Sequence, residues 1–100
     1  MARFDVFKVS DTLPLLLDVQ SGVLSDLSTR VVIPLLPVKE EGAELTRLHP
    51  IIKLECGDYV LRTAELSYVP EKILNEPIYN IEADYRDEII NALDFLFLGF

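Results

Sequence analysis

Few residues in this sequence could take part in catalysis or metal binding. There is one histidine, His49, and one cysteine, Cys56. One of each cannot supply the three or four nitrogen and sulfur ligands of the usual zinc sites, so we expect no metal and no cofactor. His49 precedes Pro50 and has no evident partner in the sequence, and we interpret it as structural. Cys56 lies beside a predicted tight turn, and we interpret it as an inert thiol.

One polar cluster combines hydroxyl groups with a guanidinium. Ser28, Thr29 and Arg30 are consecutive, and a cation beside a hydroxyl is an arrangement that phosphodiester chemistry can use to hold a scissile phosphate. A turn followed by an arginine is a much commoner origin of the same pattern. No glycine-rich phosphate loop and no nucleophile elbow accompanies it. Nothing in these residues therefore makes an enzyme more likely than a binding protein.

The composition indicates one small acidic domain spanning residues 1–100. Half of the 100 residues are hydrophobic, which is enough for a core without disulfides or metal. The net charge of -8 opposes direct binding to a nucleic-acid backbone. A single cysteine fits a reducing cytoplasm. We find no signal peptide and no apolar run that could span a membrane, so we expect a cytoplasmic protein that does not bind membranes.

Short strands dominate the first half of the chain. Alternation over residues 4–9 predicts a half-buried strand, and the apolar run 13–19 predicts a strand that is buried on both faces. The strongest β signal is 31–36, where three β-branched residues are consecutive. Pro34 and Pro37 cannot donate to a ladder, which predicts that this strand is bulged or lies at a sheet edge.

The second half adds a hairpin and turns. Residues 39–42 are predicted as a charged loop, and the strands 48–54 and 59–62 flank a turn at 56–58. Residues 65–70 suit either a strand or a short helix, and 75–77 suit a turn. Long helices between the strands are missing from the pattern, which argues against a parallel α/β fold. The sequence therefore favours a mainly β protein, a curled antiparallel sheet or barrel with one C-terminal α-helix.

That helix is amphipathic and has an unusually apolar end. Apolar residues on one face of this helix follow one another at spacings of four, four, four and three residues, and we call this face the core stripe. They are Ile81, Tyr85, Ile89, Leu93 and Leu96. Asn80 or Asp84 can cap its start and Gly99 can end it. The apolar residues outside the stripe are Phe95, Phe97, Leu98 and, beyond the helix, Phe100. These either fold back on the domain, become buried in a homodimer, or contact another protein.

Two more apolar residues stand in a polar loop. Val23 and Leu24 lie between Gln20 and Arg30 in a stretch rich in serine, threonine and aspartate. Such a pair is either tucked under the sheet, which is the commoner arrangement, or displayed for a partner. The pattern alone leaves both open.

Several segments, in this order, resemble the CcdB toxin family. They are Asp18-Val19-Gln20-Ser21, Thr29-Arg30-Val31-Val32-Ile33-Pro34-Leu35, Val69-Pro70, Ala92-Leu93-Asp94-Phe95-Leu96 and the ending Gly99-Phe100. The resemblance covers essentially the whole chain. It implies an SH3-like curled β fold and a homodimer that acts as a non-enzymatic toxin of a type II toxin–antitoxin system. Such a toxin binds the A subunit of DNA gyrase and poisons this topoisomerase, is neutralised by a CcdA-like antitoxin, and takes part in transcription autoregulation.

The resemblance also implies which residues bind gyrase. They are Val23, Leu24, Asp94, Phe97, Leu98, Gly99 and Phe100. The apolar loop and the apolar helix end would then form one surface. The best-known family pattern ends in Trp-Gly-Ile, whereas this sequence has Leu98 in place of the tryptophan and Asp94 in place of an asparagine. A leucine lacks the π face that a tryptophan offers to an arginine, a contact worth about 0.5–2 kcal/mol.

Two other functions remain open from the sequence. A MazF-like endoribonuclease toxin shares the fold, but it needs a cation for the phosphate and a general acid or base, for which Arg30 with Thr29 or His49 are the candidates. The negative net charge opposes the approach of RNA. The other alternative is a degenerate toxin that only binds its antitoxin. We expect a flexible antitoxin segment with basic groups to become ordered on the acidic dimer.

Overall fold

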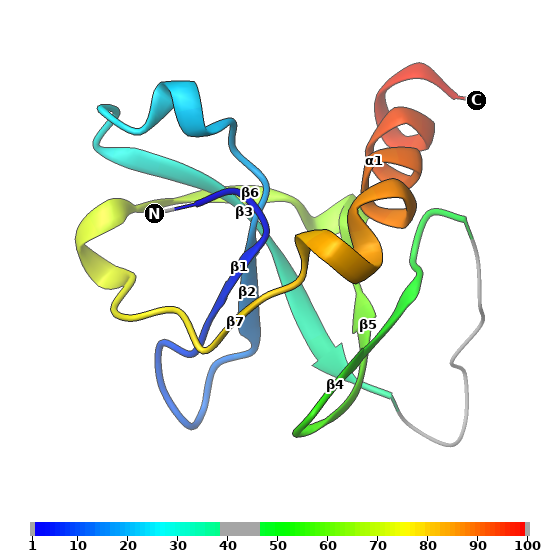
Figure 1. Ribbon diagram of the computed structural model, residues 1–100, viewed down its shortest axis with the longest axis horizontal. Coiled ribbons are helices and arrows are strands. Elements are labelled where there is room, and N and C mark those ends of the chain that lie inside the picture. The colour runs from blue at the N-terminus through cyan, green and yellow to red at the C-terminus, as the bar shows by residue number, and fades with distance from the viewer. Residues whose placement is uncertain (1, 39–46, 100) are drawn as a thin grey trace.

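The computed structural model describes residues 2–38 and 47–99. Within them the chain forms a seven-stranded antiparallel sheet and one α-helix, with three single-turn 3-10 helices (Figure 1). The strands are β1 (Asp5–Phe7), β2 (Leu15–Asp18), β3 (Thr29–Pro37), β4 (Ile51–Leu54), β5 (Gly57–Leu61), β6 (Ser67–Pro70) and β7 (Tyr79–Asn80). The helices are η1 (Gly22–Leu24), η2 (Thr63–Glu65), η3 (Glu71–Ile73) and α1 (Glu82–Leu98). This confirms the predicted mainly β fold with a C-terminal helix.

The strand β3 lies at the centre of the sheet, so the predicted edge position is wrong. The strand order is β4-β5-β3-β2-β1-β7, and β6 also pairs with β3. Along one side β3 pairs with β6 up to Val32 and with β5 from Leu35 onward. Pro34 lies between these two partners, and its carbonyl accepts the Arg62 N–H at 3.0 Å. The N and O of a strand residue point to the same side of the strand, so the nitrogen of Pro34 faces the junction of β5 and β6 as its carbonyl does. Hydrogen bonding along that side of β3 is interrupted at this junction, so the N–H that proline lacks is not needed there.

Other segments differ from the predictions in detail. All three residues of β1 are buried rather than alternately exposed, because this strand lies between β2 and β7 with apolar clusters around it. The first hairpin strand is shorter than predicted, and its turn lies one residue earlier, at Glu55-Cys56. The ambiguous stretch 65–70 is mainly a strand, β6, which follows η2. The predicted charged loop at 39–42 lies outside the described residues.

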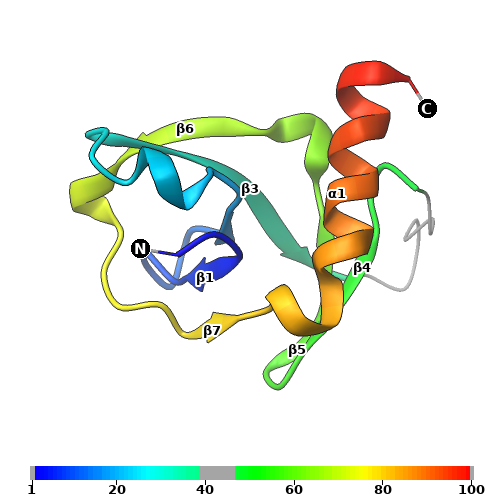
Figure 2. The ribbon, with the colours of Figure 1, turned by 45° about the horizontal axis from the view of Figure 1, so that its top comes forward.

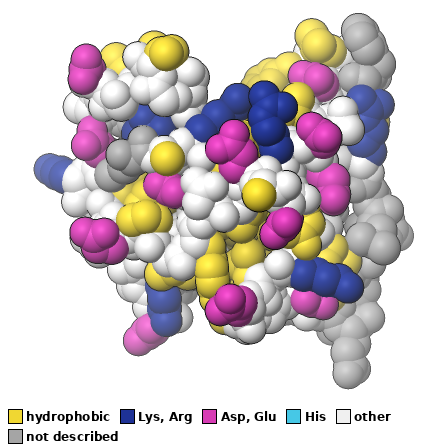
Figure 3. All heavy atoms as spheres, in the orientation of Figure 1, with side chains coloured by type: hydrophobic (Ala, Val, Ile, Leu, Met, Phe, Trp, Pro, Cys, Tyr) yellow, Lys and Arg dark blue, Asp and Glu magenta, His cyan; other side chains and the backbone are white. Residues whose placement is uncertain are grey.

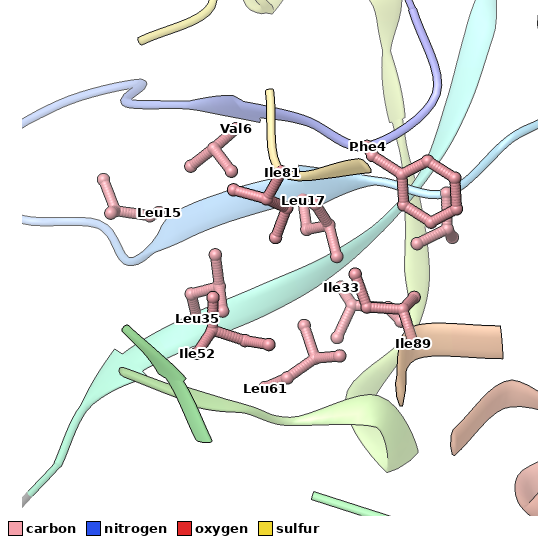
Figure 4. Close-up of a cluster of buried hydrophobic side chains, with 11 residues drawn as sticks. Phe4, Val6, Leu15, Leu17, Ile33, Leu35, Ile52, Leu61, Ile81 and Ile89 are labelled. Atoms are coloured by element: carbon pink, nitrogen blue, oxygen red, sulfur yellow. The ribbon is translucent and has the colours of Figure 1, made fainter. Parts of the chain in front are cut away.

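The curled sheet encloses one main core, which α1 covers. Figure 4 shows Ile81 and Ile89 pointing toward aliphatic side chains of the sheet, among them Leu17, Ile33 and Leu61. Burying side chains of this size stabilises the fold by roughly 1.5–3 kcal/mol each. A second, smaller cluster contains Phe7, Val32 and Leu74.

The helix itself matches its predicted stripe. Ile89 is buried, and Tyr85 and Leu93 are partly buried against the main core. At its start, Ile81 takes the N-cap position, but the predicted Asn80 contributes, since its Oδ1 accepts the Glu82 N–H at 3.1 Å. The stop at Gly99 is confirmed by its left-handed φ of 80° and by its N–H, which donates to the Phe95 carbonyl.

Tyr85 also protects an open edge of the sheet. Its hydroxyl accepts the Lys53 N–H of the edge strand β4 at 2.9 Å. We expect Tyr85→Phe to lower the free energy of unfolding by about 0.5–1.5 kcal/mol, because the Lys53 donor loses this partner. Urea denaturation measures the change. Tyr68→Phe on exposed β6 is the matched control and should change stability by less than about 0.5 kcal/mol; equal losses for the two variants would contradict this role of Tyr85.

Candidate protein-binding surface

A buried ion pair anchors the loop that contains Val23. Asp18 at the end of β2 and Arg30 near the start of β3 are both buried. The Arg30 Nε donates to Asp18 Oδ2 at 2.8 Å, and its Nη2 donates to Asp18 Oδ1 at 2.9 Å. This two-bond geometry satisfies the carboxylate and joins the two strands where the loop leaves them.

The loop displays its apolar residues instead of tucking them under the sheet. Ser21 Oγ accepts the Val23 N–H at 3.3 Å, and the Leu24 N–H donates to the Ser21 carbonyl, so η1 forms as a tight turn. Val23 at the top of this turn is 89% exposed and Leu24 is 47% exposed. Leu27 is exposed in the same loop; we did not single it out from the sequence, although it is the third apolar residue of the stretch.

The end of α1 displays a second apolar group. Phe97 is 67% exposed and Leu98 is 60% exposed, so within the described residues neither folds back on the domain. Asp94 and Gly99 are exposed beside them, and Phe100 lies outside the described residues. Phe95 is covered on one side by Arg47, whose guanidinium carbon lies 5.1 Å from the ring centroid, a cation–π contact.

The two groups lie on the same side of the molecule but do not adjoin within one chain. Figures 1 and 2 place η1 and the end of α1 on either side of β6, and Figure 3 shows hydrophobic side chains at both upper corners of that view. Tyr68, an exposed residue of β6, lies on the strand between them and was missed by the sequence reasoning. One partner could contact both groups only by spanning β6 or by binding two copies of the chain.

The residues considered for ribonuclease chemistry are not brought together within one chain. Arg30 is buried against Asp18, with Nη1 buried and unpaired among the described atoms. His49 Nδ1 lies 3.2 Å from the carbonyl of Leu61, and Leu61 pairs with Leu35. Leu35 is five residues along β3 from Arg30, about 16 Å at the rise of a strand. Among the described residues no cluster of three or more metal-binding side chains occurs.

Cys56 lies in a groove on another part of the surface. The groove has a volume of about 440 Å³ and is lined by Leu13, Tyr59 and Tyr79, among others. Cys56 is exposed, and its Sγ lies 3.6 Å from the Tyr59 hydroxyl. Hydrogen bonding to Cys56, and secondarily burial, raises the pKa of Tyr59, and the same causes raise the pKa of Tyr79. Both phenols therefore stay protonated throughout the neutral pH range.

Comparison with known proteins settles the family. The family model described as CcdB protein matches residues 3–99. The chain belongs to the CcdB family. It is thus a toxin of a toxin–antitoxin system. In the part of this CcdB-family toxin that the structure describes, no helix is both long and apolar enough to cross a membrane.

The fold of this CcdB-family toxin also occurs in two endoribonucleases from mycobacterial species. One, in complex with its cognate antitoxin, has a TM-score of 0.79 at 13% identity, over 100% of this chain and 96% of the other. The second has a TM-score of 0.76 at 16% identity, over 100% and 92% of the two chains. At these identities the likeness establishes a shared fold and does not transfer an activity.

Gly99 sets the direction in which the toxin's chain leaves α1. Its φ of 80° is a left-handed conformation that residues with a Cβ adopt at a cost of about 1–2 kcal/mol. We expect Gly99→Ala to weaken binding to a partner at the helix end more than tenfold, because alanine disfavours the left-handed conformation of Gly99. The melting temperature should change little, because Gly99 is exposed outside the core. Isothermal calorimetry measures the affinity. The control is Gly57→Ala in the β4–β5 hairpin, where φ is also positive at 143° but no partner contact is proposed; an equal loss of affinity in both variants would argue against this role.

Proposed function

We propose that this toxin binds the A subunit of DNA gyrase through Val23, Leu24, Asp94, Phe97, Leu98, Gly99 and Phe100, and poisons the enzyme in the cytoplasm without itself being an enzyme. The observation that carries the proposal is the exposure of Val23, Leu24, Phe97 and Leu98. These are large apolar side chains at the positions that the family resemblance assigns to gyrase contact. Exposed apolar residues held on short rigid elements are typical anchors of a protein interface.

Phe97 supports the proposal despite the missing tryptophan. Leu98 takes the tryptophan's place in the family pattern, and it offers area without a π face. The neighbouring Phe97 has a largely exposed ring. A guanidinium of the partner can stack on this ring, which would restore a contact worth about 0.5–2 kcal/mol.

A binding mechanism agrees with the chemistry of the described residues. The Arg30 guanidinium is enclosed with Asp18, so an RNA phosphate has no access to it in this conformation. The net charge of -8 also repels nucleic acid. The same charge attracts a basic antitoxin segment, and we propose a CcdA-like antitoxin that becomes ordered on this surface. The related fold seen with its cognate antitoxin supports this partner class.

We propose further that the toxin is a homodimer, with the two copies of α1 near the dimer axis. Phe95 and Phe97 add apolar surface beyond the part of α1 that covers the core. A second copy can cover part of this surface and bring two helix ends together. Light scattering at micromolar concentration should give twice the chain mass of 11.4 kDa, and a mass equal to one chain would contradict the dimer.

The decisive test combines two assays of the purified protein. Supercoiling and DNA-cleavage assays with gyrase should show inhibition and trapped cleavage complexes, whereas incubation with RNA in the absence of gyrase should leave the RNA intact. Val23→Asp should abolish inhibition. Leu13→Asp is the matched control, because Leu13 is also exposed. It belongs to the β1–β2 loop, which is at the bottom of Figure 1, whereas η1 is at the top.

Each alternative function has its own outcome in these assays. RNA cleavage without gyrase would replace the proposal with an endoribonuclease toxin. Antitoxin binding with neither gyrase inhibition nor RNA cleavage would identify a degenerate toxin. Inhibition that survives Val23→Asp would remove the loop from the gyrase contact.

A further inference from the structure

Gln20 is a buried polar residue whose every hydrogen-bonding group has a partner. Its backbone N–H donates to Asp18 Oδ1 at 2.9 Å, and its carbonyl accepts from Arg30 Nη2 at 3.2 Å. Its side-chain Nε2 donates to the Leu24 carbonyl at 3.1 Å, and its Oε1 accepts the Val31 N–H at 3.0 Å. A glutamine is seldom buried without such compensation.

These contacts connect the end of the sheet to the displayed loop. Paired residues of β2 and β3 end at Asp18 and Val32, and the Val19 N–H then donates to the Val31 carbonyl. Beyond this bond, the Val31 N–H donates to the side-chain Oε1 of Gln20 instead of to a backbone carbonyl. The Gln20 side chain therefore adds one more hydrogen bond to the β2–β3 ladder. The Nε2 of the same amide holds Leu24, the last residue of η1.

At neutral pH the terminal amide of a glutamine supplies both the donor and the acceptor that these two bonds need. A glutamate has no donor for the Leu24 carbonyl when it is ionised, and a methionine has neither a strong donor nor a strong acceptor. An asparagine is shorter by one methylene. The bidentate pair of Asp18 and Arg30 holds the Gln20 backbone in place. The position of the Gln20 side-chain amide is therefore fixed by this buried pair.

We propose that Gln20 is the positioning residue of the partner-binding loop: its side-chain amide fixes η1 to β3 so that Val23 and Leu24 are presented in a preformed arrangement. That Gln20 fixes η1 is independent of the proposed function, whereas its effect on gyrase affinity rests on the proposed gyrase binding. Preforming the loop removes an ordering cost that binding would otherwise have to offset. Losing the amide should therefore loosen the loop and weaken gyrase binding while the sheet stays folded.

The test uses Gln20→Glu and Gln20→Met in the full chain. Hydrogen-exchange protection is measured at the Leu24, Ser25 and Leu27 amides, whose N–H groups donate within this loop. Affinity for the gyrase A subunit is measured in parallel at pH 7.5 and pH 5. At pH 7.5 we expect both variants to lose about tenfold in loop protection and in affinity relative to wild type, the effect of about one hydrogen bond.

Acidification should distinguish positioning from a general loss of structure. In the Gln20→Glu variant, the introduced carboxyl regains a donor for the Leu24 carbonyl once it is protonated. Burial and the neighbouring carbonyl oxygen raise the pKa of this carboxyl above the usual value of about 4.3 for a glutamate. This variant should therefore recover toward wild type at pH 5, whereas the methionine variant should stay impaired at both pH values. Protection factors and affinities are compared with wild type at each pH, which removes the pH dependence of gyrase itself.

The outcomes separate this inference from the proposed function. Loop protection and affinity within twofold of wild type in both variants would overturn the positioning role. Lost loop protection with unchanged gyrase affinity would show that the preformed loop does not matter for binding, and it would also overturn the proposal. If the wild-type chain does not bind gyrase, the proposed function fails, but the exchange data still decide whether Gln20 fixes the loop.

Discussion

Removal of residues 98–100 is expected to abolish gyrase inhibition while leaving the melting temperature nearly unchanged. Leu98 is 60% exposed, so deleting it removes little core packing. Two interface anchors of about 2 kcal/mol each correspond to a loss of roughly a thousandfold in affinity. The supercoiling assay and differential scanning calorimetry measure the two effects on the same preparations. We expect antitoxin binding to survive in part, because the family resemblance implies that the antitoxin also uses other surfaces.

The comparison variant for this truncation is Ile89→Ala. Ile89 lies on the same helix but is fully buried in the main core, and its truncation should cost about 2–5 kcal/mol of stability. If the shortened chain melts as early as this variant, its helix end is structural. A shortened chain that is folded, thermally unchanged and still inhibits gyrase would exclude the assigned contact residues.

Breaking the buried ion pair should have the largest effect on stability. Asp18→Asn leaves the Arg30 guanidinium buried without a counterion, since both side chains are almost fully enclosed. We expect a loss of about 3–5 kcal/mol in the free energy of unfolding, measured by urea denaturation. A small domain has only about 5–15 kcal/mol in total, so the variant should be close to unfolding at 37 °C.

An exposed ion pair provides the matched control. Arg62 and Glu65 are joined at 2.6 Å but are each about half exposed, so Glu65→Gln should cost less than about 1 kcal/mol. The double variant Asp18→Leu with Arg30→Met should recover part of this stability, because it removes the uncompensated charge. The recovery is incomplete, because the Gln20 N–H and carbonyl lose their partners Asp18 and Arg30. A double variant as unstable as Asp18→Asn would show that the hydrogen bonds of the pair, including those to the Gln20 backbone, stabilise the strands more than the uncompensated charge destabilises them.

The sequence was most informative where structure depends on near neighbours in the chain. The α1 stripe through Tyr85 and Ile89, the stop at Gly99 and the β4–β5 hairpin were all predicted, because helix periodicity, a left-handed glycine and a short turn are local properties. The mainly β class followed from the missing helices between strands. The family resemblance, carried by motifs such as Asp18-Val19-Gln20-Ser21, was confirmed by the match over residues 3–99.

Only the tertiary structure decided features that depend on distant segments. Pro34 predicts a bulged or an edge strand from its own chemistry. The strand β3 is nevertheless central, because two different strands meet opposite this proline. The loop pattern of Val23 and Leu24 favours burial under the sheet, yet both residues are exposed. The loop that carries them is held by bonds of Gln20 and Arg30 across β2 and β3. The sequence left open whether Arg30 holds a phosphate or only follows a turn, and in the fold it is a buried partner of Asp18. Local patterns fix which conformation a segment prefers, whereas burial and pairing are set by whichever distant strand comes to lie beside it.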